Sequence, residues 1–208
     1  LSFGLHHLYP ALESLLNRQP DLYINIDLSD RKVDLVAEGL DLAFRIAELD
    51  DSTLIARKIC PIRVMLCASP AYLEQHGVPE TPDQLKSHQL LYYSLAPRSG
   101  WRFIDQQGKH YNVNIPAKIT ANNGSFLRDM AIAGHGIVSS PTFILWQAIA
   151  TGDLVPILTQ YQLPQVNAYA LYPQTRYLSQ RVRIFIDFLV ERFGENPYWD
   201  QYLPLPDV

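Results

Sequence analysis

The spacing of apolar residues changes several times along the chain, and each change predicts a secondary-structure element. Near the N-terminus leucines recur at helical spacing, at Leu5, Leu8, Leu12, Leu15 and Leu16. This spacing predicts a helix with one apolar face, begun by Ser2 as its N-cap. Pro10 lies inside the pattern, so we expect a kink or a break there.

The next stretch of chain predicts two strands around a short helix. Residues 21–29 alternate apolar and polar side chains, which is typical of a strand. Asp30 then stands where it can cap a helix that Gly39 ends. Residues 40–46 form an almost continuous apolar run, which indicates a strand covered on both faces.

Helix starts follow strand-like segments at several later points. Residues 62–68 run directly into Ser69-Pro70. A serine N-cap followed by proline at the first helical position favours a helix start, because the hydroxyl accepts from an unpaired N–H and proline already has a helical φ. The same strand-to-helix transition is predicted at Asn123 and at Ser140-Pro141, and the capping-box spacing of Thr81 and Gln84 predicts a further helix start after a short helix that Gly77 ends.

The remaining segments predict a hairpin, a return strand and a C-terminal helix. Residues 101–104 and 111–115 flank a polar turn that contains glycine, which favours a hairpin. Residues 166–172 form a second apolar strand that stops at a proline. Residues 182–193 have the clearest amphipathic helical pattern of the chain. The proline-containing tail after Gly194 is expected to be extended.

Strands alternate with helices through most of the chain, which predicts an α/β fold with mainly parallel sheets. We interpret the apolar runs at 62–68 and 166–172 as two crossover strands that join two Rossmann-like lobes. Residues 1–68 and 174–208 would form lobe I, and residues 69–173 would form lobe II. A cleft between the lobes, beside the C-terminal ends of strands, is then the expected functional site.

Composition narrows the classes of function. The 208 residues are 48 % hydrophobic and 18 % charged, with a net charge of −4, so the chain can bury a core but is poorly suited to grip a nucleic-acid backbone. No apolar run is long enough to span a membrane. The chain opens at Leu1 without an initiator methionine, which we interpret as a piece of a longer protein. Cys60 and Cys67 lack metal or redox spacing and are expected to be buried, reduced thiols of a cytoplasmic protein.

The sequence offers little catalytic chemistry. Motifs of serine hydrolases, P-loops, dinucleotide sites and zinc proteases are absent, and the adjacent His6 and His7 would point about 100° apart on a helix. We therefore expect no catalytic residue, no metal and no cofactor.

Several helix starts carry polar residues, at Ser2, Ser29-Asp30, Ser69, Asn122-Asn123 and Ser139-Ser140. If several converge on the cleft, their N–H groups would suit a carboxylate or another small anion. The alternative is that each residue only caps its own helix. Arg45 could add a charged contact to a ligand or could form a structural ion pair.

The chain resembles a known family, the effector-binding domain of LysR-type transcriptional regulators. The resemblance covers nearly the whole chain and rests on Ser2-Phe3-Gly4 with Leu8-Tyr9-Pro10, Asp34 to Ile46, Leu54 to Lys58, Cys67 to Leu73, Ala133 to Ile137, and Tyr172 to Phe188. It implies two lobes like those of type 2 periplasmic solute-binding proteins, with a small-molecule effector in the cleft and no enzymatic activity. It also implies homodimers of this domain within a tetrameric regulator that contacts DNA only through an N-terminal winged helix-turn-helix absent from this chain.

By this resemblance Ser2, Ser29, Ile46 and residues 139–143 would line the effector site, with Asn123 nearby. Together with the helix starts and Arg45, the full set of candidate effector contacts is Ser2, Phe3, Ser29, Asp30, Arg45, Ile46, Asn123, Ser139, Pro141 and Phe143. The polar residues of this set indicate a small polar or anionic effector such as an organic acid. Many family members have a polar residue at or beside the position of Ile46, and the isoleucine departs from that pattern. Arg45 could compensate, but neighbouring strand residues point to opposite faces.

Two other functions remain as alternatives. A solute-binding protein that delivers a small organic anion to a transporter shares the lobed design, and a signal peptide upstream would distinguish it from a regulator with a helix-turn-helix. An enzyme that uses the same cleft is the third class, and loss of an activity on mutation of a cleft residue would support it.

Overall fold

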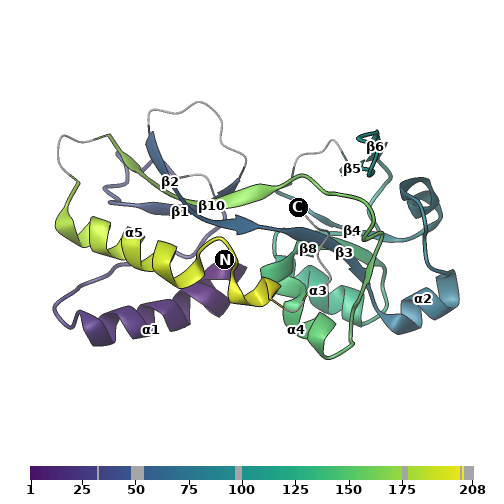
Figure 1. Ribbon diagram of the computed structural model, residues 1–208, viewed down its shortest axis with the longest axis horizontal. Helices are drawn as coiled ribbons and strands as arrows, with labels where there is room; N and C mark the ends of the chain where they lie inside the picture. The colour runs from purple at the N-terminus through teal and green to yellow at the C-terminus, as the bar shows by residue number, and fades with distance from the viewer. Residues whose placement is uncertain (32, 48–53, 97–99, 175–177, 202, 204–208) are drawn as a thin grey trace. The chain divides into compact units, whose positions relative to one another are not determined.

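The computed structural model describes residues 1–31, 33–47, 54–96, 100–174, 178–201 and 203. These residues form two compact units. The first unit contains Phe3–Ile62 and Val166–Tyr198, together with Leu1. The second unit contains Arg63–Gln165 and the chain from Trp199 onward, together with Ser2. Each unit has its own sheet and its own helices, as an α/β fold requires (Figure 1).

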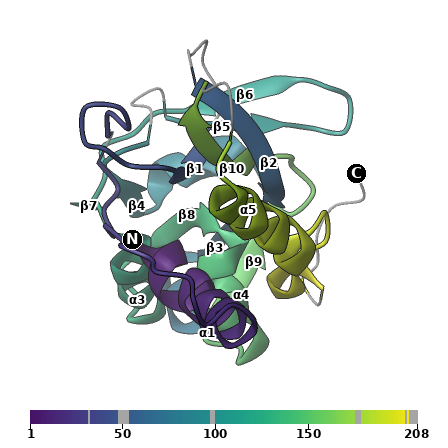
Figure 2. The same cartoon turned by 90° about the vertical axis from the view of Figure 1, so that its left-hand side faces the viewer.

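The sheet of the first unit has three antiparallel strands in the order β1-β10-β2. The strands are β1 (Ala43–Ala47), β2 (Leu54–Ile62) and β10 (Val166–Pro173). The central strand, β10, contributes fully buried alanines at positions 168 and 170. Helix α5 (Gln180–Phe193) packs against β2, and α1 (Tyr9–Arg18) packs against α5, so both helices lie on one side of this sheet (Figure 2).

The first helix begins differently from the prediction. A π-helical turn, η1 (Gly4–Leu8), leads into α1, and the expected break near Pro10 takes this form. Proline has no N–H to donate to the carbonyl four residues earlier, and a wider helical turn on its N-terminal side accommodates the missing hydrogen bond. Ser2 does not cap the helix, because Phe3 is the N-cap residue, already has helical φ/ψ (−60°, −42°) and makes no side-chain cap bond.

Two predicted elements between residues 21 and 39 are wrong. Residues 21–29 form no strand. Of their alternating apolar side chains, Leu22 is half-buried, and Ile24, Ile26 and Leu28 are exposed. Residues with strand propensity form a strand only where a neighbouring strand or a core packs against them. Among the described residues of 30–39 there are turns and no helix. The Asp34 carboxylate accepts hydrogen bonds from the N–H groups of Val36 (3.1 Å) and Ala37 (3.0 Å), a local pattern that competes with helix formation.

The second unit has a five-stranded mixed sheet in the order β7-β4-β8-β3-β9. Its strands are β3 (Val64–Ala68), β4 (Leu90–Tyr93), β7 (Ile119–Ala121), β8 (Ile137–Pro141) and β9 (Val155–Ile157). Strand β4 is parallel to β7 and β8, whereas β3 is antiparallel to β8 and β9. The expectation of mainly parallel sheets is therefore wrong, because alternation of strands and helices along a chain does not fix which strands become neighbours. The sequence analysis also missed β9.

The predicted helix starts of the second unit are mostly confirmed. The Ser69 hydroxyl accepts from the Tyr72 N–H (3.4 Å) at the start of α2 (Pro70–His76). The Gln84 side chain accepts from the Thr81 N–H (3.2 Å) at the 3-10 helix η2 (Pro82–Ser87). The remaining helices are α3 (Gly124–Ile132) and α4 (Thr142–Ala150).

Two apolar clusters cover the two faces of this sheet. Leu66, Leu90 and Ile137 pack with α2 and the predicted hairpin, which the structure confirms as β5 (Trp101–Ile104) and β6 (His110–Val113). On the other face, strand residues including Cys67 pack with α3 and α4, below the sheet in Figure 1. Both cysteines are buried and unbridged, and burial raises the pKa of the Cys67 thiol to about 12.

The C-terminal segment returns to the second unit. The tail that was expected to be extended contains a 3-10 turn, η3 (Tyr198–Asp200), whose Trp199 and Asp200 are buried. The end of the predicted tail, at 202 and 204–208, lies outside the described residues.

Candidate functional site

Five of the predicted effector-contacting residues lie in the first unit, and they do not form one cluster. Phe3 is a core residue: its ring stacks on Phe44 with a centroid distance of 4.4 Å and meets Phe193 edge-on. Ser29 and Asp30 lie in an exposed loop, where the Asp30 carboxylate pairs with the amino group of Leu1.

Arg45 and Ile46 are half-buried neighbours on β1, opposite Tyr169 and Ala168 of β10. As adjacent strand residues they point to opposite faces of the sheet, so only one of them can face a given ligand.

The other five predicted residues lie in the second unit, around the starts of α3 and α4. Strand β8 places Ser139 opposite Leu66 and Pro141 opposite Val64. Pro141 is the N-cap residue of α4 and supplies no side-chain acceptor, so the expectation that Ser140 caps this helix is wrong. Ser140 is instead a buried strand residue.

The first turn of α4 is held by backbone and aromatic contacts. The Thr142 N–H donates to the carbonyl of Arg63 (2.9 Å). The Phe143 ring meets the buried Trp199 ring edge-on, with 6.1 Å between centroids. The Thr142 side chain is 0 % exposed, and its Oγ1 has no hydrogen-bond partner among the described residues.

The start of α3 is capped as the sequence predicts. The Asn123 Oδ1 accepts from the Phe126 N–H (2.8 Å), which leaves the side-chain NH2 group of Asn123 as a donor. In the first turn of the helix, the Ser125 hydroxyl donates to the hydroxyl of Ser2 (3.0 Å). Ser2 thus contributes to this region as a buried hydroxyl and not as a helix cap.

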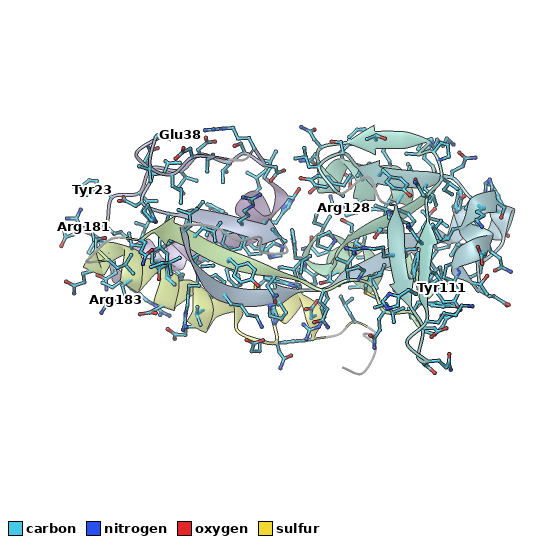
Figure 3. The ribbon with its side chains drawn as sticks, turned by 90° about the horizontal axis from the view of Figure 1, so that it is seen from above. Tyr23, Glu38, Tyr111, Arg128, Arg181 and Arg183 are labelled. Carbon is cyan, nitrogen blue, oxygen red and sulfur yellow. The ribbon has the colours of Figure 1, made fainter. Side chains whose placement is uncertain are left out.

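A glycine brings the two helix starts together. A Cβ atom on Gly124 would lie 2.5 Å from Ile144 Cδ1 and 3.7 Å from Ser140 Oγ. An alanine at this position would require the end of the Ile144 side chain to shift, whereas Ser140 Oγ would lie at an ordinary contact distance. Arg128, labelled in Figure 3, also joins the two helices, since its Nη1 donates to the carbonyl of Ile144 (3.4 Å).

We call five polar residues around these two helix starts the α3–α4 polar cluster: Ser2, Asn123, Ser125 and Arg128, which belong to the first turns of α3 or contact them, and Thr142, the first residue of α4. The sequence analysis missed Ser125, Arg128 and Thr142. The sequence contains a signal for the first two: Ser125 and Arg128 are three residues apart in the predicted helix, so they lie on one face of it, just after the Asn123 cap. Thr142 had no such signal, because its burial depends on how α4 packs.

The cluster combines hydroxyl donors and acceptors, an amide donor, a guanidinium and two helix N-termini, which suits hydrogen bonding to a small polar or anionic molecule. Arg128 also pairs with Asp129 (2.8 Å), so its charge is partly neutralised. Among the described residues no group of three or more His, Cys, Asp and Glu could hold a metal ion. No helix in the described part of the chain is long and apolar enough to cross a membrane.

Comparison with known proteins identifies the family. The family model described as the LysR substrate binding domain matches residues 1–194. An uncharacterized HTH-type transcriptional regulator of Haemophilus influenzae is 38 % identical over 86 % of this chain and 62 % of its own length. The HTH-type transcriptional regulator CrgA of Neisseria meningitidis serogroup B is 34 % identical over 92 % of this chain and 64 % of its own. The chain therefore spans a little over three fifths of the length of these two curated relatives.

Solved structures give the same result. The regulatory domain of CrgA from Neisseria meningitidis, described as a LysR-type transcriptional regulator, is 34 % identical and has a TM-score of 0.80, with 92 % of this chain and 94 % of that chain covered. The full-length virulence activator AphB of Vibrio cholerae is 28 % identical with a TM-score of 0.80, and the match covers 91 % of this chain but 64 % of that chain. The predicted resemblance and the periplasmic-binding-protein-like α/β fold are thus confirmed, and the chain belongs to the LysR substrate-binding domain family.

Proposed function

We propose that the α3–α4 polar cluster binds the effector of this regulator. The single observation that carries the proposal is the Thr142 hydroxyl, which is fully buried and has no partner among the described residues. A buried hydroxyl without a hydrogen bond costs free energy, and such groups in native proteins call for a specific explanation. A ligand group that hydrogen-bonds to Thr142 would remove this cost.

The expected effector is a small polar or anionic compound, such as an organic acid. The positive ends of the α3 and α4 dipoles and the Arg128 guanidinium support an anionic group, and the Ser2 and Ser125 hydroxyls support further hydrogen bonds. The other predicted contacts, at Phe3, Ser29, Asp30, Arg45, Ile46, Ser139, Pro141 and Phe143, remain predictions. Phe3 and Phe143 would act mainly through packing, since both are buried among aromatic rings.

In the full-length protein we expect the effector to act through a change in population. A ligand shifts an equilibrium only as far as its affinity differs between two states of the protein. Here the two states would be arrangements of the domain that place an attached DNA-binding domain differently on a promoter, in the cytoplasm. The relatives are transcriptional regulators, which favours this role over a solute-binding protein or an enzyme.

We also propose that this domain forms homodimers, within a tetrameric full-length regulator, through an apolar surface of the first unit. A groove of about 250 Å³ is lined by Gly4, Leu5, Leu8, Tyr9, Leu12, Ile26 and Leu28. Leu5, Tyr9, Ile26 and Leu28 are exposed. Apolar patches of this kind mark interaction surfaces in soluble proteins, and association with a second copy would cover them.

A thermal-shift screen tests the effector proposal. The 208-residue chain is scanned against a library of small organic acids, amino acids and aromatic compounds. A ligand at 100 times its dissociation constant should add about 2.7 kcal/mol of stability and raise the melting temperature. The shift should be lost in Thr142→Val, which keeps the shape of the side chain and removes the hydroxyl.

Thr120→Val is the matched control, because Thr120 is an exposed residue of β7 in the same unit. It should keep the ligand response. A hit that survives Thr142→Val and Ser125→Ala unchanged would place the effector elsewhere, and the absence of any hit across the library would argue against a small organic anion.

A further inference from the structure

The C-terminal segment makes a third passage between the two units. After Phe3 the chain changes unit between Ile62 and Arg63, between Gln165 and Val166, and again between Tyr198 and Trp199. The first two passages were expected as crossover strands. The third was not, and it lies within the 3-10 turn η3.

On its first side this passage is tied to η1. The Tyr198 hydroxyl lies 2.6 Å from Nδ1 of His7, which is buried. Burial raises the pKa of Tyr198, although Arg192 opposes the shift, so the hydroxyl keeps its proton at neutral pH. The neighbours of His7 in η1 include Leu5 and Leu8, which line the apolar groove of the first unit.

On its second side the passage is tied to the start of α4. Trp199, which is 1 % exposed, contacts Phe143, and the Asp200 carboxylate lies 2.7 Å from Nη1 of Arg63. The carbonyl of that same Arg63 accepts from the Thr142 N–H. Trp199 and Asp200 therefore hold the first two residues of α4, Trp199 directly and Asp200 through its partner Arg63.

We propose that η3 is a strap that couples the start of α4 in the second unit to η1 in the first. Its three consecutive residues join contacts that each belong to one unit, so a change at Thr142 and Phe143 reaches His7 through covalent bonds and a short series of contacts. Arg63 and Asp200 are positioning residues in this arrangement. A role for the strap in the response to an effector rests on the proposed function, because the strap would then link effector binding at α4 to the dimerisation groove. The coupling itself does not need a ligand.

Energetic coupling between two sites is reciprocal, so the strap is testable from either end. Tyr198→Phe removes only a hydroxyl that contacts the first unit. It should accelerate hydrogen exchange of the amides of Thr142 to Leu145, in the second unit, by about two- to fivefold. An effect of this size is expected when the loss of one hydrogen bond makes local opening of the segment easier. Amides of α3 and β10 should not change.

Tyr169→Phe is the matched control. The Tyr169 hydroxyl likewise takes part in a hydrogen bond within the first unit, in which the Asn167 amide donates to it (3.2 Å), but Tyr169 lies on β10 and outside the strap. It should leave α4 exchange unchanged. In the reverse direction, Asp200→Asn should accelerate exchange in η1 relative to β10.

If the α4 amides exchanged at equal rates in Tyr198→Phe and Tyr169→Phe, the proposed coupling through η3 would be wrong. Acceleration spread evenly over the chain would also contradict it, because it would indicate general destabilisation. Both measurements use the protein without ligand, so their outcome is independent of whether the thermal-shift screen finds an effector.

Discussion

Nη1 of Arg63 lies 2.7 Å from Oδ2 of Asp200, and the two side chains are only 21 % and 4 % exposed. The second carboxylate oxygen, Oδ1, is buried without a partner among the described residues. The Arg63 guanidinium is therefore the hydrogen-bond donor that holds the Asp200 side chain in this buried position. Removal of one member of a buried pair leaves the other charge unpaired in a medium that solvates it poorly.

Arg63→Met should lower the free energy of unfolding by about 3–5 kcal/mol, because it strands the Asp200 carboxylate. The double variant Arg63→Met with Asp200→Leu should recover most of that loss. Urea denaturation measures the free energy of unfolding of the single and of the double variant. Lys86→Met is the contrast, because Lys86 and Asp83 form an exposed pair at 2.8 Å, and its cost should stay below about 1 kcal/mol. A similar small cost for Arg63→Met would contradict the prediction.

Gly124→Ala should destabilise the second unit by about 1 kcal/mol, the low end of the usual cost of overpacking, because Ile144 Cδ1 is the end of a flexible side chain. The new Cβ would stand 2.5 Å from Ile144 Cδ1, so the side chain or α4 has to move. Ile144→Val removes that Cδ1 atom and should restore part of the stability in the double variant, as thermal unfolding can measure. If the loss of stability in the double variant equalled the sum of the losses in the two single variants, the close approach of Cβ to Ile144 Cδ1 would not be the cause of the destabilisation.

Stability should fall as the pH is lowered below about 6.5, in part through His88, whose ordinary pKa lies there. Burial and the nearby His76 lower the pKa of His88 in the folded protein. The unfolded chain therefore takes up the proton first, so this contribution is complete above the ordinary pKa and is lost as the pH falls toward the folded value. Nδ1 of His88 also lies 3.3 Å from the Tyr72 hydroxyl, which accepts from the Gln89 N–H.

Melting temperatures of His88→Gln between about pH 8 and pH 5, a range that brackets the ordinary histidine pKa, check this prediction. The variant should lose less stability on acidification than the parent protein. His110→Gln, at an exposed position of β6, should follow the parent curve. Parallel curves for all three proteins would show that His88 does not contribute.

Leu5→Glu should weaken self-association by about tenfold or more, which corresponds to ~1.4 kcal/mol. Leu5 is 51 % exposed and lines the apolar groove, so a carboxylate there would be desolvated in a dimer. Sedimentation equilibrium of the 208-residue chain measures the effect. Val36→Glu is the control in the same unit, at a side chain that is 72 % exposed and outside the groove. Equal dimer dissociation constants for Leu5→Glu and Val36→Glu would show that the interface lies on another surface.

Local signals in the sequence were reliable where both partners lie within a few residues. Ser69 and Asn123 cap α2 and α3, and Gln84 reaches back to Thr81, as their spacing predicts. Such contacts depend only on the backbone of one turn. Ser140 carried the same signal and failed, because β8 continues through Pro141 and buries the serine.

Tertiary structure decided what depends on distant neighbours. The alternating residues 21–29 had strand propensity but no strand partner, and the direction of β3 could not be inferred from the alternation of elements. The strap through η3 was hidden for the same reason, since nothing local marks Asp200 as the partner of Arg63, 137 residues away.

The sequence by itself determined the family, the α/β class, the two cysteine thiols as buried residues and most helix starts, because composition, periodicity and capping act over short distances. Only the tertiary structure decided which polar groups share a site. Ser2 meets Ser125 across 123 residues, and Thr142 is left buried without a partner among the described residues, through packing that closes where Gly124 has no side chain. Such contacts depend on the exclusion of water and on close approach between elements, which no single segment of the chain specifies.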